Sequence, residues 1–290
     1  MTKNPWVETW KIFRKNKGAL FGLSIVSLFS LVALFAPLVA PFDPIEQFRD
    51  VPILPMPPAW LEGGVSEYLF GTDTIGRDML SRLIYGARVS LLVGFLVVCF
   101  SLTVGTLLGL LAGYVGGWVD TLVMRLTDVL MSLPSILLAM VVVAILGESL
   151  FNAILAVSVV AIPAFVRLVR ASVIAEKEKE YVQAAQSFGA SPFRVCFLNI
   201  LPNCMAPIIV QGSLGFSEGI LWVAGLGFLG LGAQAPTPEW GTMLSESKDY
   251  FESDPWMVSL PGICILILVL GFNLLGDGLR DALDPKIKRR

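Results

Sequence analysis

The run VSLLVGFLVVCFSLTVGTLLGLLAGYVGGWV, at positions 89–119, contains no charged residue over 31 positions. An α-helix rises about 1.5 Å per residue, so about 20 apolar residues cross the roughly 30 Å hydrocarbon core of a bilayer. The run exceeds that length. It therefore predicts a membrane-spanning helix and makes the chain an integral membrane protein.

Five further stretches have the same character and indicate five more spans, near positions 18–42, 129–147, 149–166, 207–232 and 255–276. Only 15% of the 290 residues are charged, against roughly 25% in soluble domains. The first stretch is too long, and too far from the start of the chain, for a signal peptide. We therefore expect an all-α integral membrane protein with six transmembrane helices, the first of them an uncleaved anchor.

Charge sets the expected orientation. Six spans put both ends of the chain on one side, and five basic residues precede the first span: Lys3, Lys11, Arg14, Lys15 and Lys17. Basic residues favour the cytoplasmic side, so both termini are expected there. With this topology 16 of the 21 lysines and arginines are cytoplasmic, and the five outside are Arg49, Arg77, Arg82, Arg88 and Lys248. The net charge of −2 gives no support for nucleic-acid binding.

The expected organisation has five parts. They are a cytoplasmic tail (1–17), an anchor helix (18–42), an extracytoplasmic segment (43–88), a five-helix core (89–280) with a cytoplasmic loop (167–205) and an extracytoplasmic loop (233–256), and a basic cytoplasmic tail (281–290). Within the outside segment, GTDTIGRDMLSRLIYGARVSL at 71–91 offers Thr72 or Asp73 as a helix N-cap, followed by Ile75, Met79 and Leu83 near helical spacing. A surface helix leading into the second span is predicted there.

The cytoplasmic loop contains the stretch YVQAAQSFGASPFRVCFLNILPN at 181–203. An apolar helical face is predicted for Tyr181, Ala184, Ala185 and Phe188, and Gly189 supplies a helix stop. A second helix is expected from an N-cap at Ser191 up to Pro202. Two helices this short need something to bury their apolar stripes. Packing against the chain's own helix ends or the lipid surface, and docking into a soluble partner, are both open.

These residues resemble the EAA loop of ABC importer permeases, whose pattern is EAA, three residues, Gly, nine residues, I-x-L-P. Matching positions are Ala184, Ala185, Gly189, Leu201 and Pro202. Gln183 stands where the family usually has Glu, and Asn199 where it usually has Ile. The resemblance implies that 183–202 couples the chain to an ATPase, with a hydrogen bond at most replacing a salt bridge at Gln183.

Three more stretches are similar to the C-type permease subunits of the dipeptide, oligopeptide and nickel importers, of which the dipeptide importers look closest. They are GTDTIGRDMLSRLIYGARVSLLVG (71–94), LGFLGLGAQAPTPEWGTML (226–244) and NLLGDGLRDALDPK (273–286). The resemblance implies a type I ABC importer transmembrane domain that moves dipeptides or other short peptides by alternating access. Haem, nickel chelates and similar solutes are alternative cargoes.

The resemblance also implies a location and partners. The chain is expected to be a multi-pass protein of the bacterial plasma (inner) membrane that pairs with a homologous second permease, two ATP-binding subunits and an extracytoplasmic substrate-binding protein. It has no G-x-x-x-x-G-K-[ST] phosphate loop, so ATP and Mg are expected to be used by the partner subunits and no cofactor by this chain.

A second glycine pattern, GLGFLG at 225–230, lies in or beside a span, and we expect it to serve helix packing or a bend.

A membrane enzyme and an ion-driven transporter are the alternatives. The chain has no histidine, and one acid, Glu218, lies deep in a span, so neither a nucleophile with its base nor a pair of acids can be assembled. An ion-driven transporter typically shows internal repeats and several intramembrane charges, and neither is apparent. No catalytic residue and no metal site are therefore expected, and the four cysteines imply no disulfide framework.

Glu218 is the candidate for the translocation path. An ionised carboxylate inside a bilayer costs several kcal/mol unless it is paired or hydrated, so Glu218 is expected to face a cavity. A structural hydrogen bond to a neighbouring helix is the other possibility.

Arg125 and Asp128, three residues apart, are expected to form an ion pair on one helix face.

Overall fold

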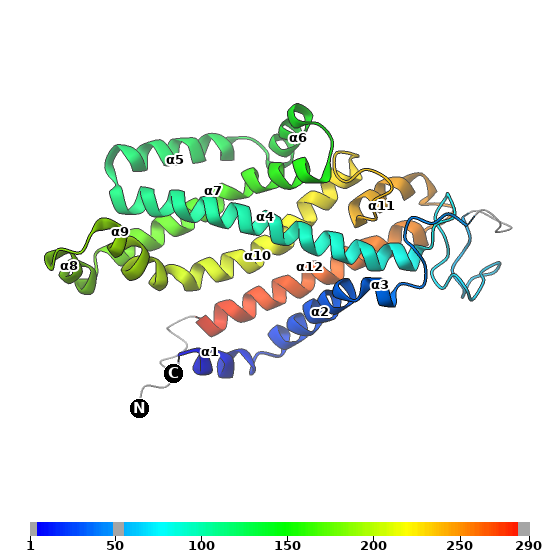
Figure 1. Cartoon of the computed structure of the whole chain (residues 1–290), viewed down its shortest axis with the longest axis horizontal. Helices are drawn as coiled ribbons and strands as arrows, with labels where there is room; N and C mark the ends of the chain where they lie inside the picture. The colour runs from blue at the N-terminus through cyan, green and yellow to red at the C-terminus, as the bar shows by residue number, and fades with distance from the viewer. Residues whose placement is uncertain (1–4, 49–54, 284–290) are drawn as a thin grey trace.

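The structure, a computed structural model, describes residues 5–48 and 55–283. The residues outside these ranges include Lys3, Arg49 and most of the basic tail predicted at 281–290. The described residues form an elongated helical bundle (Figure 1). Its helices are α1 (Pro5–Phe13), α2 (Lys17–Leu34), α3 (Ala36–Val39), α4 (Met79–Val115), α5 (Gly117–Ser132), α6 (Ser135–Leu146), α7 (Leu150–Lys177), α8 (Glu180–Ser187), α9 (Pro192–Arg194), α10 (Leu201–Phe228), α11 (Trp240–Ser247) and α12 (Trp256–Leu283).

The all-α membrane architecture is confirmed. Within the described ranges, five helices are long and apolar enough to cross a bilayer, and α5 with α6 forms a sixth apolar segment that bends by 95°. The span predicted at 129–147 therefore contains a sharp bend, between Ser132 and Ser135. Leu133 has an extended backbone (φ −96°, ψ 143°), as expected for a residue that precedes a proline, because the proline ring disfavours the helical conformation before it. Pro163, by contrast, lies inside the unbroken helix α7.

The helix of the second span, α4, begins at Met79, ten residues before the start of the predicted span, and so includes the end of the 43–88 segment. The N-cap of α4 is Asp78, whose carboxylate accepts a hydrogen bond from the backbone N–H of Ser81 at 2.7 Å. No separate surface helix begins at Thr72 or Asp73. Instead Thr72 pairs with Asp78 in an antiparallel bridge, and Asp73 accepts from the backbone N–H of Arg77, so this stretch closes into a tight loop.

Close packing of α4 on α7 forms the centre of one half of the bundle. A Cβ atom added to Gly105 would lie 2.4 Å from the Cβ of Phe165, and one added to Gly109 or Gly113 would lie within 3 Å of Val169 or Val173. The four-residue glycine repeat thus gives α4 a smooth face on which α7 rests, as small residues do between membrane helices.

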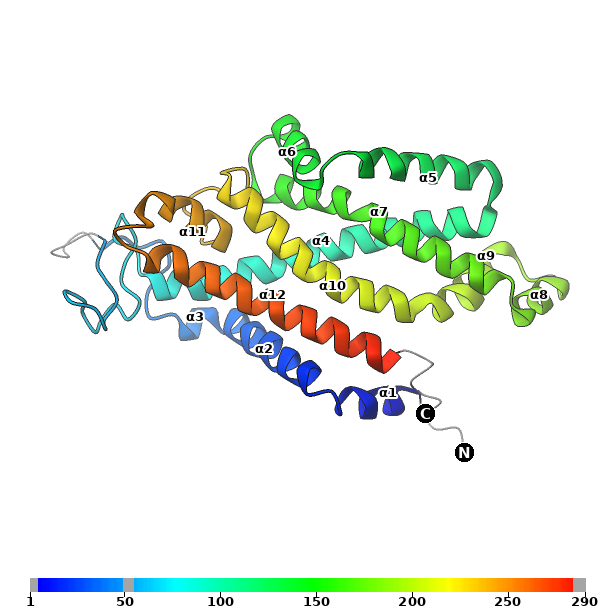
Figure 2. The ribbon, with the colours of Figure 1, turned by 180° about the vertical axis from the view of Figure 1, so that it is seen from behind.

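Helix α10 runs through the middle of the molecule, in contact with α4, α7 and α12 (Figure 2). At one end of the bundle lies α8, together with α1 and the last turns of α12, and at the other lie α11 and the 55–78 loop (Figure 1). We refer to these as the α8 end and the α11 end. GLGFLG (225–230) lies at the close of α10 and is preceded by helix rather than the strand that a dinucleotide fingerprint requires.

Candidate functional site

The 181–203 segment forms the tip of the α8 end. Helix α8 stops where predicted, because Gly189 adopts a left-handed backbone (φ +81°) that ends helices. The hydroxyl of Ser191 then caps α9 by accepting from the N–H of Arg194 at 3.4 Å. The second predicted helix does not end at Pro202. A π-helical turn, Val195–Ile200, shifts the register so that the N–H of Leu201 bonds to the carbonyl of Cys196, and the helix continues into α10.

The apolar face predicted for α8 is mostly exposed and does not pack within this chain. Val182, not a member of that face, is fully buried, whereas Phe188 is 91% exposed. One side of α8 therefore packs on the chain's own helices, while the predicted face remains open. Phe193 and Leu198 are also largely exposed, at 72% and 68%. These three side chains, Phe188, Phe193 and Leu198, form what we call the exposed apolar set.

The positions that match the EAA pattern come from two elements. Gln183, Ala184 and Ala185 lie on α8, the first two exposed and the third half-buried. The side chain of Gln183 is exposed and donates to the carbonyl of Glu178 at 3.2 Å. Leu201 is half-buried and Pro202 exposed at the start of α10, with Gly189 in the turn between the two elements.

A polar network that sequence reasoning missed fixes α8 to its neighbours. The hydroxyl of Tyr181 donates to the carboxylate of Glu176, at the end of α7. The amide of Asn203, on α10, donates to the Tyr181 oxygen at 3.1 Å. Lys179 completes the network with an ion pair to Glu176 at 2.6 Å. Burial and the bond to Glu176 raise the pKa of Tyr181 to about 12. Movement of α8 is therefore tied to both α7 and α10.

Glu218 lines a pocket of about 220 Å³ beside the bend between α5 and α6. The lining comes from α4, α5, the start of α6, α7 and α10, and so includes the bend between α5 and α6. Its carboxylate is exposed in this chain, and among the described residues no group donates a hydrogen bond or an ion pair to it. A larger groove of about 580 Å³, between α10 and α12, is lined by apolar side chains and Asn273 and carries no charge.

The predicted pair of Arg125 and Asp128 is not formed. Asp128 accepts instead from the guanidinium of Arg167, on α7, at 2.7 Å. A second pair follows the same pattern, since Arg170 bonds both oxygens of Asp120 at 2.5 and 2.6 Å. The two acids of α5 thus form ion pairs with arginines on α7 and hold the two helices together, instead of pairing within α5. A single sequence gives no signal for this choice.

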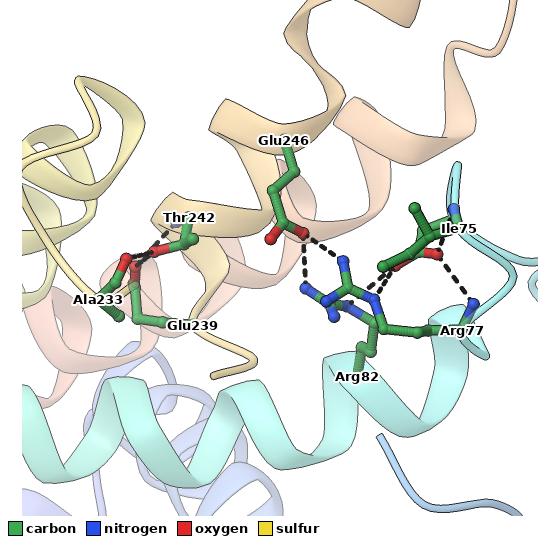
Figure 3. A network of polar contacts seen from close by, with 8 residues as sticks. Ile75, Arg77, Arg82, Ala233, Glu239, Thr242 and Glu246 are labelled. Atoms are coloured by element: carbon green, nitrogen blue, oxygen red, sulfur yellow. Dashed lines mark hydrogen bonds and ion pairs between the residues drawn. The ribbon is translucent and has the colours of Figure 1, made fainter. Parts of the chain in front are cut away.

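A cluster of four charged groups at the α11 end was also missed (Figure 3). Arg77 contacts Asp73 at 2.5 Å and Glu246 at 2.7 Å, and Arg82 contacts Glu246 at 2.8 Å. Both arginines are almost fully buried. The four charges cancel, and each is paired within the cluster, which makes burial tolerable. The cluster joins the loop before α4 to α11.

Beside this cluster, Glu239 caps α11. Its carboxylate accepts from the backbone N–H groups of Gly241 and Thr242, both at 2.9 Å, and from the Thr242 hydroxyl at 3.2 Å (Figure 3). Burial raises the pKa of Glu239, opposed by these hydrogen bonds. In residues 5–48 and 55–283, no three metal-ligating side chains gather into a cluster.

Two family models match the chain. Residues 105–289 match the binding-protein-dependent transport system inner membrane component, and residues 4–58 match the N-terminal transmembrane domain of oligopeptide transport permease C.

Several named proteins are similar to this chain over almost its whole length. A di/tripeptide transport system permease protein of Pseudomonas aeruginosa is 56% identical over 98% of this chain and 93% of its own length. Dipeptide transport system permease proteins of Escherichia coli K12 and Haemophilus influenzae are 57% and 53% identical, over 98% and 99% of this chain and 94% and 97% of their own lengths.

A solved structure shows the same fold. Inward-facing conformations of the MetNI methionine ABC transporter include a chain that superposes with a TM-score of 0.59 at 20% identity, over 71% of this chain and 98% of that one.

Proposed function

Because the chain belongs to the family of binding-protein-dependent transport system inner membrane components, and is thus a multi-pass inner-membrane permease subunit of an ABC importer, we propose that its cargo is dipeptides or other short peptides. The support is the naming of relatives that are 53–57% identical over nearly the full length. Transport proceeds by alternating access, with no covalent chemistry in this chain. Haem and similar peptide-sized solutes are tested as alternative cargoes by the same assay.

The 181–203 segment is the docking site for the ATP-binding subunits. The observation that carries this proposal is the exposed apolar set on a segment whose other side is already anchored through Val182 and Tyr181. A segment that is anchored and yet keeps phenylalanines in water needs a partner surface to bury them. Gln183 offers that partner a hydrogen bond in place of the family's usual ion pair.

The proposed assembly is consistent with this placement. The α8 end faces the cytoplasm, and α1 and the close of α12 lie at the same end, so both termini are cytoplasmic (Figure 1). The α11 end faces outward, toward the substrate-binding protein. A second, homologous permease completes the pore and two ATP-binding subunits supply hydrolysis. Glu218 lies on the path between the two ends.

A matched pair of substitutions tests the docking site. Gly189 and Gly230 share the same left-handed backbone (φ +81°) and open surroundings, but lie at opposite ends of the bundle. We expect Gly189→Arg combined with Ala185→Arg to lose the ATP-binding subunits in a mild-detergent pull-down, and Gly230→Arg to keep them. Equal retention by both variants would overturn the docking proposal.

Uptake into proteoliposomes tests the cargo. The purified importer with its binding protein is expected to accumulate a labelled dipeptide only when ATP is enclosed with the ATP-binding subunits. Competition by unlabelled dipeptide, and none by haem, is the expected result. Accumulation of haem without accumulation of dipeptide would replace the proposed cargo.

A further inference from the structure

The pocket around Glu218 is built asymmetrically. One face of α10 supplies Gly215, Glu218, Gly219 and Trp222, which follow helical spacing. The two glycines pack against Phe165 and Val97 on the neighbouring helices, so the side chains that α10 contributes to the lining are the Glu218 carboxylate and the Trp222 indole. Glu218 is the one charged residue among those that line the pocket. The lining is therefore acidic at one point and includes no basic side chain.

The carboxylate lacks a partner. The part of the chain that the structure describes offers it neither a hydrogen bond nor an ion pair. A charged group at this depth is expensive unless water or a counter-ion meets it. The carboxylate of Glu218 would thus favour a positively charged ligand over a neutral or negatively charged one.

The lining distinguishes between kinds of cation. Calcium takes six to eight oxygen ligands, and magnesium a near-ideal octahedron, whereas this pocket offers one carboxylate and the hydroxyl of Ser135. An ammonium group needs fewer oxygen ligands than either metal ion. It donates three hydrogen bonds, and an indole face stabilises it through a cation–π contact. Trp222, one helical turn from Glu218, lines the same pocket.

The rest of the pocket suits the first residue of a peptide. Its volume of about 220 Å³ corresponds to about seven water molecules at roughly 30 Å³ each. Leu130, Met131, Val157 and Val160 supply apolar surface for a side chain. With no lysine or arginine in the lining, the carboxylate end of a peptide has no charged partner there.

We infer that Glu218 binds the protonated amino terminus of peptide cargo inside the permease, with Trp222 beside the ammonium group. The inference rests on the proposed peptide cargo and deepens it. It makes a free amino end a requirement of the pore itself, in addition to any requirement of the binding protein. A peptide blocked at its amino end loses this contact, whereas one blocked at its carboxyl end keeps it.

Cysteine protection measures occupancy of the pocket without the binding protein. Ser135, exposed and in the lining, is replaced by Cys in the assembled permease–ATPase complex, with Cys99 replaced by Ser because it is also exposed. Maleimide labelling is then followed with alanyl-phenylalanine, its amino-acetylated form and its carboxyl-amidated form. We expect the free and amidated peptides to protect the cysteine, and the acetylated peptide to need at least a tenfold higher concentration.

Variants at Glu218 connect this selectivity to the carboxylate. Glu218→Gln is expected to abolish the preference for a free amino end and to slow dipeptide uptake about tenfold, with unchanged recovery of the ATP-binding subunits. Glu218→Asp should restore the preference in part. Glu148→Gln removes an acid from the exposed turn before α7 and serves as the matched control.

Two failures are distinguishable. Equal protection by the acetylated and free peptides, or unchanged selectivity in Glu218→Gln, overturns the role of Glu218 while wild-type dipeptide uptake leaves the proposed cargo intact. If the wild-type complex takes up no dipeptide, the proposed cargo fails and the inference fails with it.

Discussion

Arg82 and Glu246, 164 positions apart in the sequence, are in direct contact: a guanidinium nitrogen of Arg82 lies 2.8 Å from a carboxylate oxygen of Glu246. The contact fastens α11 to the first turn of α4. Arg77 shares the same carboxylate oxygen at 2.7 Å, so one acid holds two buried arginines.

Removing that acid is expected to weaken the α11 end. Glu246→Gln leaves both arginines with one acidic partner, Asp73, and a buried charge without its partner costs about 2–4 kcal/mol. Thermal unfolding in lipid nanodiscs should show a lower midpoint. Asp249→Asn, which removes an exposed acid three residues away, should leave the midpoint unchanged. A similar midpoint for both variants would show that the cluster contributes no stability.

Phe188→Asp is expected to abolish ATPase binding without unfolding the permease. The side chain is 91% exposed, so its replacement removes contacts with a partner and few within the chain. Phe251→Asp, the same exchange at a 63% exposed position between α11 and α12, is the control. Copurification with the ATP-binding subunits and thermal stability are measured together. Loss of stability in Phe188→Asp would contradict the exposed placement of this ring.

Tyr181→Phe is expected to loosen α8 while docking persists. The substitution removes the donor to Glu176 and the acceptor for Asn203. Glu176 keeps Lys179 and Asn203 keeps the Asn199 carbonyl as partners, so the loss is that of ordinary hydrogen bonds, about 0.5–1.5 kcal/mol. Faster amide exchange in α8, and less transport per ATP hydrolysed, should accompany normal recovery of the ATP-binding subunits. Tyr250→Phe, at the other end of the molecule, is the control.

The same tyrosine gives a pH dependence. Its pKa is raised from 10 to about 12 in the folded segment, so the neutral hydroxyl is favoured there. Below pH 10 the tyrosine is neutral whether or not α8 is folded, and its contribution is complete. Between pH 10 and about 12 the unfolded form ionises first, so stability is lost as the pH rises. The tyrosinate absorbance difference between wild type and Tyr181→Phe should titrate near 12; titration near 10 would contradict the network.

Gly105→Ala is expected to destabilise the α4–α7 contact. The added Cβ would meet the Cβ of Phe165 at 2.4 Å, and overpacking of this kind costs about 1–3 kcal/mol, more than alanine's helix propensity returns. Gly225→Ala, on α10, meets nothing within 4 Å and should be neutral or slightly stabilising. Thermal midpoints of the two variants provide the comparison, and equal midpoints would show that the helices can separate at no cost.

The membrane architecture was readable from the sequence because bilayer thickness fixes how long an apolar run must be. The stop at Gly189 was readable because glycine permits a left-handed backbone at little cost. A kink at Pro134 was readable because a proline disrupts a helix, but the sequence did not show that the bend reaches 95°. Its signal was local: Pro134 restricts Leu133 to an extended conformation.

Other features were beyond a single sequence. Helix α8 has eight residues with apolar side chains on more than one face, so the pattern alone did not show that Val182 is buried and Phe188 open. Asp128 has arginines within reach on its own helix and on α7, and only the packing of α5 against α7 decides for Arg167. The contact of Arg82 with Glu246 likewise depends on the folded position of α11.

The helical segment from Pro192 to Phe228, which includes the π-helical turn Val195–Ile200, joins the proposed docking site to the pocket around Glu218. Glu218 lies 26 positions after Pro192, which at 1.5 Å per residue is about 39 Å along the axis. If the proposed docking site is right, closure of the ATP-binding subunits would act on the pocket through the same helical segment that carries Glu218.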